Sequence, residues 1–570
     1  MTSHRRTLRL SVIGTGYLGA THAACMAELG YEVIGLDIDQ AKIDVLRTGS
    51  VPFYEPGLDE VLARNIEAGR LTFTTSFEEI AAFADIHFVC VGTPQAPGAQ
   101  RADLSQVFGS IESLAPHLRP DALVVGKSTV PVGTAAEIEA ILGATAASGV
   151  EVAWNPEFLR EGYAVQDTLH PDRLVVGAHS PRAEALLREV YAPIIDEGVP
   201  FLVTDFPTAE LVKVAANSFL ATKISFINAM AEVCEAAGAD VTKLAEAIGH
   251  DPRIGSRFLA AGLGFGGGCL PKDIRAFMAR AGELGAEDAV AFLREVDQIN
   301  LRRRSATVDL ARESLGGSFR GRRITVLGAT FKPDSDDVRD SPSLDVAVAM
   351  SNAGADVVVH DPKGLVNAER VYPHLAYEPE LAAALAGAEL IVLGTEWREY
   401  RELDPRTISG SGVRHVVVDV HAEATAEKEA IGWYVDGRAS AVIGTHTHVQ
   451  TADARLLPGG TAYLTDVGMT GPMDGVLGMR RDEVLARFLT GLPQRFDVLT
   501  EGPRELSYAV VDLRPDGRAA AIRRGRIVET PQAEWTHVPP EAQEASASPA
   551  KGSSGSPASG ASAPEAGAGR

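Results

Sequence analysis

Residues 8–19 read LRLSVIGTGYLG. The apolar run Leu8–Ile13 predicts a β-strand, Gly14–Gly19 form a tight turn, and an alanine-rich helix follows through Leu29. Glycines in the pattern G-x-G-x-x-G let such a turn close and let backbone N–H groups approach a pyrophosphate at the helix N-terminus. The order of strand, glycine turn and helix therefore predicts a dinucleotide-binding βαβ unit.

The second strand of this unit ends at an acidic residue. Glu32–Leu36 predict the strand, and Asp37 follows it. A carboxylate at this place can accept hydrogen bonds from an adenosine ribose and would repel a 2′-phosphate. We therefore expect NAD rather than NADP as the cofactor, bound at Gly14, Gly16, Tyr17, Leu18, Gly19 and Asp37.

A similar pattern recurs in the second half of the chain. Arg323–Leu327 predict a strand, the turn GATFK (328–332) follows, and Asp356–His360 predict another strand before Asp361. Strands that alternate with helices indicate parallel sheets, so we expect an α/β protein with two Rossmann-like, doubly wound domains. Between them Ala209–Ala237 and 287–314 predict long helices, which can serve as a spine, a dimer surface, or both.

Composition excludes several classes of protein. The 570 residues carry a net charge of −23, which argues against a non-specific nucleic-acid or anionic-membrane binder. The four cysteines (Cys25, Cys90, Cys234 and Cys269) form no C-x-x-C pair, which argues against a disulfide framework or zinc finger and fits the reducing cytosol. No apolar run approaches the ~20 residues of a membrane span, and the N-terminal residues predict a strand rather than a signal peptide. We expect a cytoplasmic protein.

A second dense motif is GFGGGCLPKD, residues 264–273. It places Cys269 after a run of glycines, on backbone that a substrate could approach closely. A nearby cation would lower the pKa of the thiol and raise its thiolate fraction. Taken alone, the motif equally fits a buried structural cysteine.

Seven ordered motifs across residues 7–419 resemble the UDP-glucose/GDP-mannose dehydrogenase family. They are GTGYLG, VGTPQ, KSTVPVGT, NPEFLREGYAVQD, AELVKVAANSFLATKISFINAMAE, RIGSRFLAAGLGFGGGCLPKD and GATFKPDSDDVRDSPSLDV. The resemblance implies an NAD-binding Rossmann domain at 1–205, a central helical and dimerisation domain at 206–315, and a Rossmann-like domain for the UDP-sugar at 316–420. The active site would lie in the cleft between the two Rossmann-like domains.

The resemblance also implies a four-electron oxidation. The C6 alcohol of a nucleotide sugar loses hydride to NAD, Cys269 captures the aldehyde as a thiohemiacetal, a second hydride leaves a thioester, and water releases the carboxylate. The long match around Cys269 favours UDP-glucose, giving UDP-glucuronate. Dehydrogenation of GDP-mannose or UDP-N-acetylmannosamine is the alternative within the family.

Residue roles carry over from the family by position. Those implied for catalysis are Cys269, Lys213, Asn217, Glu157, Asp273 and Thr129. Further cofactor contacts are implied at Lys42, Thr93, Thr129, Glu161, Lys272 and Arg339. Substrate contacts are implied at Glu157, Phe158, Leu159, Arg160, Glu161, Lys213, Asn217, Arg253, Phe258, Leu259, Ala260, Ala261, Gly262, Gly266 and Lys332. Arg253 would reach the substrate of a neighbouring subunit, which makes a homodimer through the central helix part of the expectation.

Spacing alone says less about these residues. Lys213 and Asn217 are four apart, so they share one face of a helix, but such residues are usually solvated. Glu157 and Glu161 could be acids at a helix N-terminus, and Lys332, Arg339 and Asp273 could be surface charges.

The family pattern stops near residue 420. Residues 421–527 resemble the C-terminal part of the YmdB-like metallophosphoesterases, which are 2′,3′-cyclic-nucleotide phosphodiesterases. His421, His446 and His448 resemble three ligands of that family's two-metal site. In an extended chain, the side chains of His446 and His448 would point to the same side. The other ligands and the catalytic histidine come from the first half of those enzymes, which has no counterpart in this chain. We therefore expect neither phosphodiesterase activity nor a metal for the dehydrogenase.

Two possibilities remain for the appended segment, residues 421–535. It is a gene fusion or assembly artefact that joins two broken frames, or a piece retained as structure. In the second case, a helix over 423–430 and a strand over 432–435 would complete the second Rossmann-like sheet. For the whole chain, a further alternative is a catalytically dead fusion whose sheets no longer close. Residues 536–570, rich in Ala, Ser, Gly and Pro, predict a disordered tail.

Overall fold

The computed structural model describes residues 8–237, 239–403, 417–422, 424–490, 496–514, 516–529 and 535–538. The chain divides into two compact units, Met1–Leu403 and Asp404–Arg570. Within the described residues, no helix combines the length and the apolarity needed to cross a bilayer.

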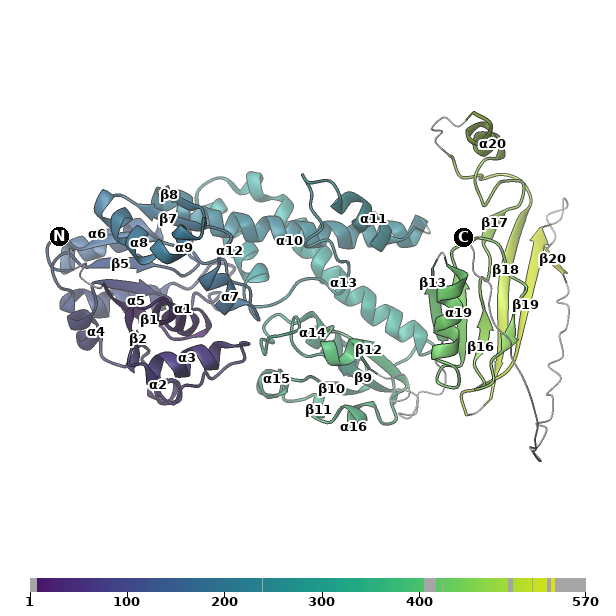
Figure 1. Cartoon of the computed structure of the whole chain (residues 1–570), viewed down its shortest axis with the longest axis horizontal. Helices are drawn as coiled ribbons and strands as arrows, with labels where there is room; N and C mark the ends of the chain where they lie inside the picture. Colours follow the sequence, from purple (N-terminus) through teal and green to yellow (C-terminus); the bar gives the residue numbers. More distant parts are fainter. Residues whose placement is uncertain are drawn as a thin grey trace, which may run out of the picture. The chain divides into compact units, whose positions relative to one another are not determined.

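The first unit begins with an eight-stranded sheet in the order β3-β2-β1-β4-β5-β6-β7-β8, drawn in purple and blue in Figure 1. The first six strands have the order typical of dinucleotide-binding sheets and run parallel. Strand β7 runs antiparallel to β6. The strands are β1 (Arg9–Ile13), β2 (Glu32–Leu36), β3 (Leu71–Thr74), β4 (Ile86–Val89), β5 (Leu123–Gly126), β6 (Glu151–Trp154), β7 (Leu174–Ala178) and β8 (Phe201–Thr204).

Helices cover both faces of this sheet because successive strand residues point to opposite sides. In β1, Leu10 and Val12 join one hydrophobic cluster, whereas Ile13 joins the other. The first face packs against α1 (Tyr17–Glu28), α2 (Gln40–Arg47), α3 (Leu58–Glu67), α8 (Pro181–Val190) and α9 (Ala192–Asp196). The second packs against α4 (Phe77–Phe83), α5 (Ser105–Leu114), η1 (Ala115–His117) and α6 (Thr134–Thr145). Both faces are covered, as a doubly wound fold requires.

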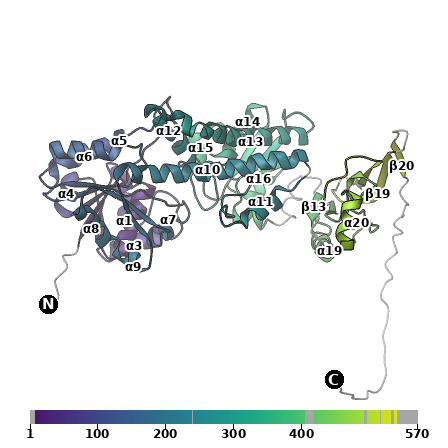
Figure 2. The same cartoon turned by 90° about the horizontal axis from the view of Figure 1, so that it is seen from above.

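A set of helices follows the first sheet. Helix α10 (Phe206–Ala237) is the longest element and packs along α13 (Phe292–Ser314), as Figures 1 and 2 show. The helix predicted from Ala209 is confirmed and begins three residues earlier. The second predicted helix is interrupted, because η2 (Glu287–Val290) is a 3₁₀ turn separated from α13 by Ala291. The remaining helices of this region are α11 (Val241–Gly249) and α12 (Leu270–Glu283).

A second parallel sheet completes the first unit in the order β11-β10-β9-β12. It comprises β9 (Arg323–Leu327), β10 (Asp356–His360), β11 (Ala376–Tyr377) and β12 (Leu390–Leu393). Its helices are α14 (Pro342–Asn352), α15 (Leu365–Val371), α16 (Leu381–Leu385) and α17 (Arg398–Arg401). The predicted pair of Rossmann-like sheets is thus confirmed.

The turn after β9 differs from the turn after β1. No helix follows GATFK directly, since α14 begins only at Pro342. Ser341 caps that helix by accepting a hydrogen bond from the Leu344 N–H, and proline suits the first helical position. The intervening residues 328–341 form a long loop that faces the cysteine motif, as described below.

The second unit contains two small sheets of its own. The first has the order β13-β14-β16-β15, with helix α19 (Thr425–Tyr434) against one face. The second has the antiparallel order β17-β18-β19-β20, and its long strands pack on the other face of the first. The strands are β13 (Val417–His421), β14 (Ala441–Thr445), β15 (Arg455–Leu456), β16 (Ala462–Leu464), β17 (Thr470–Pro472), β18 (Arg504–Leu513), β19 (Ala519–Glu529) and β20 (Trp535–Val538). One further helix is α20 (Arg481–Thr490).

This arrangement corrects two predictions for the appended segment. Residues 432–434 continue helix α19 instead of forming a strand, because Gly432 packs against the Tyr463 ring on the helix side of the sheet. Strand β13 pairs with β14, so the segment builds its own sheet and does not complete β11-β10-β9-β12. The prediction of a disordered tail was wrong for residues 536–538, which belong to β20. Residues 539–570 lie outside the described residues.

Candidate active site

A cavity of about 700 Å³ opens where β1 and β4 separate in the first sheet. At this point the strand order reverses, which is where doubly wound sheets bind nucleotides. Gly14, Gly16, Asp37 and Lys42 line the cavity together with residues of α5. The predicted glycine turn and the predicted acid therefore meet at one site.

The glycines fit a turn that carries a pyrophosphate. Gly14 has φ +84°, and a Cβ at Gly19 would lie 1.8 Å from the carbonyl oxygen of Gly14. A Cβ at Gly16, by contrast, would have no neighbour within 4 Å, so its backbone faces open space. This is the space that a phosphate needs beside the start of α1.

Hydrogen bonds hold the carboxylate of Asp37 in place as a hydrogen-bond acceptor. Its Oδ2 accepts hydrogen bonds from the Thr15 N–H at 3.0 Å and from Lys42 Nζ at 2.8 Å. Burial raises the pKa of Asp37, but the hydrogen bond from Lys42 and those from backbone N–H groups outweigh it and lower the pKa below its usual value. The carboxyl group is therefore ionised at neutral pH.

The second sheet also has an acidic residue after its second strand, but this residue has different hydrogen-bond partners. Asp361 follows β10 as Asp37 follows β2, and it accepts hydrogen bonds from Ala329 N–H and Thr330 N–H. However, the same Oδ2 also accepts a hydrogen bond from Trp397 Nε1 at 3.1 Å, and Thr395 occupies the position where a Cβ on Gly328 would lie. In the second sheet the acid is thus bound by a side chain that follows β12, Trp397.

Cys269 lies at the N-terminus of α12. It is exposed, whereas Cys25, Cys90 and Cys234 are buried. The surrounding protein atoms nevertheless desolvate a thiolate there. The pKa of the Cys269 thiol is raised to about 12, because burial and the negative charge of Glu157 raise it by more than the positive charge of Lys213 lowers it. A nearby cation does lower this pKa, as expected, but burial and the neighbouring carboxylates outweigh it, so the thiolate fraction falls instead of rising.

The opposing cation comes from helix α10 and not from Lys272 of the motif. Lys213 is buried, and its Nζ lies 3.0 Å from Oε1 of Glu157. Burial lowers the pKa of Lys213, but its acidic neighbours, above all the carboxylate of Glu157 and then that of Asp273, raise it by more. Lys213 therefore stays an ammonium ion beside the thiol.

One turn further along α10, Asn217 joins the same cluster. Its Nδ2 donates to Oδ2 of Asp273 at 2.7 Å, and Lys272 Nζ donates to Oδ1 of the same carboxylate at 2.5 Å. Asn217 and Asp273 are both buried. The interpretation of these residues as solvated helix or surface groups is therefore wrong, and the shared helix face predicted for Lys213 and Asn217 is confirmed.

The glycine run before Cys269 is packed tightly against the loop after β9. A Cβ at Gly266 would lie 2.4 Å from the Asp340 carbonyl oxygen, one at Gly267 would lie 2.8 Å from the Phe331 ring, and one at Gly268 would lie 2.2 Å from the Arg339 guanidinium carbon. The loop after β9 thus packs directly against the glycines that precede Cys269, which we call the cysteine segment. Gly267 also donates a backbone hydrogen bond to the Arg339 carbonyl at 2.9 Å.

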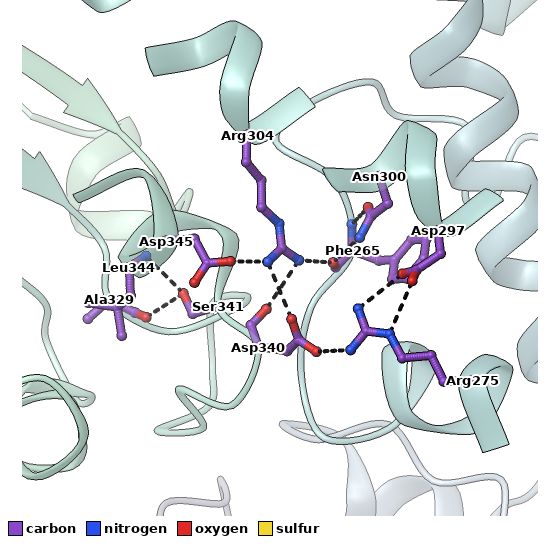
Figure 3. A network of polar contacts seen from close by, with 10 residues as sticks. All are labelled: Phe265, Arg275, Asp297, Asn300, Arg304, Ala329, Asp340, Ser341, Leu344 and Asp345. Carbon is purple, nitrogen blue, oxygen red and sulfur yellow. Dashed lines mark hydrogen bonds and ion pairs between the residues drawn. The ribbon is translucent and has the colours of Figure 1, made fainter. Parts of the chain in front are cut away.

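A polar network joins this segment to α12, α13 and α14, as Figure 3 shows. Arg304 of α13 donates to the Phe265 carbonyl at 3.1 Å and pairs with Asp340 and Asp345. Asn300 exchanges two hydrogen bonds with the Phe265 backbone. Arg275 of α12 bridges Asp297 and Asp340, at 3.1 Å to each. The network fixes both ends of the cysteine segment between helices.

A second group of predicted residues gathers around Glu161. Ser335 donates to its carboxylate at 2.9 Å, Arg339 lies 3.5 Å away, and Lys332 donates to its backbone carbonyl. Burial and the negative charge of Asp337 raise the pKa of Glu161 to about 7, against the opposing charge of Arg339. Glu161, Lys332 and Arg339 thus come from two domains to one place. Neither Ser335 nor Asp337 was predicted, although both stand in the motif that contains Lys332.

A cavity of about 420 Å³ adjoins the Lys213 cluster. Its lining includes the predicted residues Glu157, Phe158, Leu159, Arg160, Lys213, Asn217 and Phe258. Cys269 does not line it. Two buried residues in its wall, His22 and Lys127, were not predicted, although Lys127 begins the motif KSTVPVGT and could have been found there.

The remaining predicted residues lie at varied distances from these groups. Thr93 donates to the Thr129 carbonyl at 2.8 Å, and Thr129 lines a small recess with Lys272 and Asp273. Gly262 donates its N–H to Asn228 of α10 at 2.9 Å. Leu259 is buried, whereas Ala260 and Ala261 are exposed. Arg253 is exposed and pairs with Asp251 within its own loop, so its predicted contact stays a prediction.

The two described histidine side chains of the appended segment do not adopt the expected extended geometry. His446 and His448 follow β14 and have φ values of +117° and +65°. The side chain of His421 lies outside the described residues. Within the part of the chain that the structure describes, no group of three or more His, Cys, Asp or Glu is arranged to hold a metal ion.

Comparison with known proteins agrees with this geometry. Three models of the UDP-glucose/GDP-mannose dehydrogenase family match the chain: the NAD binding domain at residues 8–195, the central domain at 207–302 and the UDP binding domain at 325–424. The chain belongs to this family. Its NAD-binding domain makes it an NAD-dependent oxidoreductase. Residues 397–524 match the model of YmdB-like protein, which confirms the resemblance of the appended segment.

Individual relatives match about 70% of this chain over most of their own length. UDP-glucose 6-dehydrogenase of Rhizobium meliloti (strain 1021) is 41% identical over 416 residues, which are 72% of this chain and 95% of that protein. UDP-glucose 6-dehydrogenase YwqF of Bacillus subtilis (strain 168) is 40% identical over 398 residues, 69% of this chain and 89% of that protein. Among solved structures, a UDP-glucose dehydrogenase from Pyrobaculum islandicum aligns with a TM-score of 0.68 at 40% identity, over 71% of this chain and 94% of that one.

The ionised Asp37 predicts cofactor preference. Replacing Asp37 with Ser should lower the ratio of kcat/KM for NAD to that for NADP by about tenfold or more, because a repulsive charge next to a 2′-phosphate costs more than about 1.4 kcal/mol. The ratio is measured by initial-rate kinetics with both cofactors. Asp44→Asn, on the helix α2 that follows Asp37, removes an equal charge outside the cavity and serves as the control. An unchanged ratio in Asp37→Ser would contradict the assignment.

The raised thiol pKa predicts how Cys269 reacts without ligands. Between pH 8 and pH 10 its alkylation by iodoacetamide should accelerate about 100-fold, whereas a thiol with a pKa near 9 would gain only about tenfold. Labelling is followed by mass spectrometry, with the three buried cysteines as internal references.

Two variants test the causes of this shift in opposite directions. Glu157→Gln should speed the labelling at pH 8 by removing a negative neighbour, and Lys213→Met should slow it by removing the positive one. Equal rates in both variants and the wild type would show that these charges do not control the thiol.

Proposed function

We propose that the protein oxidises UDP-glucose at C6 to UDP-glucuronate and reduces two NAD per sugar. The observation that carries the proposal is the cluster in which an accessible thiol lies beside a buried ammonium ion and two carboxylates. An alcohol must pass through an aldehyde to become an acid, and a thiol is the group that can retain the aldehyde between the two oxidations. The names of the relatives support UDP-glucose as the sugar.

In this proposal Cys269 acts on the aldehyde formed by the first oxidation. A bond forms between its sulfur and C6, and the thiol proton passes to the former carbonyl oxygen, giving a thiohemiacetal. Because the thiol pKa is raised in the free enzyme, this proton is still present when the aldehyde arrives. Loss of hydride and of the hydroxyl proton then leaves a thioester. NAD supplies the hydride acceptor for both oxidations.

Lys213 and Asn217 are proposed to stabilise negative charge on the C6 oxygen. The ammonium ion of Lys213 needs no proton transfer to do this, since its pKa is raised. Asn217 can turn its amide only within the limits set by Asp273, to which it donates at 2.7 Å. Both groups are therefore fixed before substrate binds.

The last step is hydrolysis of the thioester. Water adds to C6, the C–S bond breaks, Cys269 regains its proton and the carboxylate leaves. We propose Glu157 as the general base, with Asp273 and Thr129 positioning the water. Glu157 lies at the wall of the 420 Å³ cavity, where its Oε2 accepts the Leu159 N–H at 2.6 Å and its Oε1 faces Lys213.

Binding roles follow the clusters described above. We propose that the 700 Å³ cavity takes the adenosine part of NAD through Gly14, Gly16, Asp37 and Lys42. Tyr17, Leu18 and Gly19 are proposed to complete this site, and Thr93, Thr129, Glu161, Lys272 and Arg339 to contact the rest of the cofactor. The UDP-sugar is proposed to contact residues 157–161, Lys213, Asn217, residues 258–262, Gly266 and Lys332.

We also propose that two chains pair through α10. Phe226 and Val233 lie seven residues apart on this helix, so they share a face, and their exposed fractions are 48% and 57%. Exposed apolar rows of this kind mark protein interfaces. Lys223 on the same helix donates to the carbonyls of Ile254 and Gly255, which holds the loop of Arg253 beside that helix. A partner's substrate is the proposed target of Arg253.

The reaction is tested by its stoichiometry. The purified full-length protein should form two NADH per UDP-glucose, measured at 340 nm with limiting sugar and excess NAD. Cys269→Ser should lose at least about 100-fold in steady-state rate, since a covalent nucleophile is removed, while its NAD affinity stays unchanged. Cys234→Ser, a buried cysteine elsewhere on α10, is the control. One NADH per sugar in the wild type, or an active Cys269→Ser, would overturn the mechanism.

The dimer is tested by a charge on its proposed face. Analytical ultracentrifugation should give twice the chain mass of 60.2 kDa for the wild type and a single chain for Phe226→Glu. Burying the introduced carboxylate would cost several kcal/mol. Val366→Glu places the same charge on an exposed apolar residue of α15 and should remain a dimer. A monomeric wild type would contradict the proposal.

A further inference from the structure

Glu55 is a buried carboxylate to which the reaction above assigns no role. It stands just before α3, far from the catalytic cluster in sequence, and only 5% of the residue is exposed. Its Oε1 accepts the Ala164 N–H at 2.7 Å, and its Oε2 accepts the Gly162 N–H at 2.6 Å. Both oxygens thus hold the backbone immediately after Glu161.

The same carboxylate reaches the glycine turn of the first sheet. Tyr17, the residue that opens α1, donates its hydroxyl to Oε2 of Glu55 and accepts the Gly162 N–H at 3.1 Å. Burial raises the pKa of Tyr17, and the hydrogen bond with Glu55 raises it further, so the phenol keeps its proton and remains a donor. One carboxylate therefore ties the turn to residues 157–164, which we name the strap.

The strap is held from its other side by the second sheet. Lys332 donates to the Glu161 carbonyl, and Ser335 donates to the Glu161 carboxylate. Gly162 has φ +78°, and a Cβ there would lie 2.6 Å from the Asp334 carbonyl oxygen. No side chain fits at this point, so the strap is clamped between Glu55 and the loop after β9.

We propose that Glu55 is a positioning residue that holds the strap in the conformation that binds the sugar nucleotide. This inference rests on the proposed function, because the strap contains Glu157 and lines the 420 Å³ cavity. The predicted consequence is selective: loss of the Glu55 carboxylate weakens the sugar site more than the cofactor site. A residue that contributes only to stability would affect the two ligands alike.

The chain offers a matched control for this experiment. Asp59 lies four residues further on, in the first turn of α3, and its Oδ1 accepts the Val51 N–H at 2.9 Å. It fastens the same 51–57 segment but makes no contact with the strap in the described hydrogen bonds. Glu55→Gln and Asp59→Asn therefore remove one charge each from the same neighbourhood.

The test compares the wild type, Glu55→Gln and Asp59→Asn in the full-length protein. In Glu55→Gln the amide NH₂ must face a backbone N–H, so kcat/KM for UDP-glucose should fall about tenfold or more, as expected when a charge-assisted hydrogen bond is lost. The dissociation constant of NAD without sugar should change less than about twofold, because the glycine turn keeps its own backbone bonds. Asp59→Asn should match the wild type in both values.

A second readout does not depend on turnover. UDP-glucose should raise the unfolding temperature of the wild type and of Asp59→Asn, and this increase should be lost in Glu55→Gln while the increase caused by NAD remains. Should Glu55→Gln fail to fold, Glu55→Asp keeps the charge but shortens the side chain by one methylene, so it cannot keep both the Gly162 and the Ala164 N–H at their present distances. In Glu55→Asp, kcat/KM for UDP-glucose should fall about threefold while the dissociation constant of NAD changes less than about twofold.

Two results would overturn the inference: wild-type kinetics in Glu55→Gln, or an equal weakening of NAD and UDP-glucose. Where Glu55→Asp replaces Glu55→Gln, an unchanged kcat/KM has the same meaning. Failure of the proposed function is distinct, because the wild type and Asp59→Asn would then both form no NADH from UDP-glucose.

Discussion

The site depends on the buried ammonium ion of Lys213. Removing an ammonium ion from water costs several kcal/mol unless opposite charges and hydrogen bonds replace the lost hydration. Lys213 meets this condition through Glu157 at 3.0 Å and through the nearby Cys269 and Asp273, and its pKa is raised despite burial. Because these partners come from the exit of β6 and from the start of α12, the cation fixes α10 relative to both. The positive charge of Lys213 also acts to lower the pKa of the Cys269 thiol.

Close packing supplies the rest of the geometry. The loop after β9 leaves no room for side chains at Gly266, Gly267 and Gly268, and Arg304 and Arg275 tie the surrounding helices to that loop. Ion pairs from both arginines to Asp340 hold that loop, although the Nε of Arg304 has no hydrogen-bond partner among the described residues. The cysteine segment is therefore set by the second Rossmann-like sheet, although Cys269 itself precedes that sheet in the chain. Both sheets are needed to position one sulfur atom.

The appended segment makes its own structure. Strand β13 pairs with β14, Lys428 and Asp466 form a buried ion pair at 3.0 Å, and α19 covers the sheet that results. The family model for UDP binding reaches residue 424, while the YmdB-like match begins at 397, so the two matches overlap in sequence. Within that overlap the described strand, β13, belongs to the second unit. The appended piece is thus a folded addition and not a missing part of the second Rossmann-like sheet.

The sequence by itself determined the features that depend on near neighbours. Glycine spacing at Gly14–Gly19, an acid after the second strand and the four-residue interval between Lys213 and Asn217 each specify local geometry, and the structure has all three. Only the tertiary structure decided three other features. They are the direction in which the pKa of the Cys269 thiol shifts, the packing of the glycine run, and the hydrogen bonds by which Glu55 holds the strap. Glu55 and Gly162 are 107 residues apart, and desolvation depends on every atom that surrounds a group. No pattern in a short window contains that information.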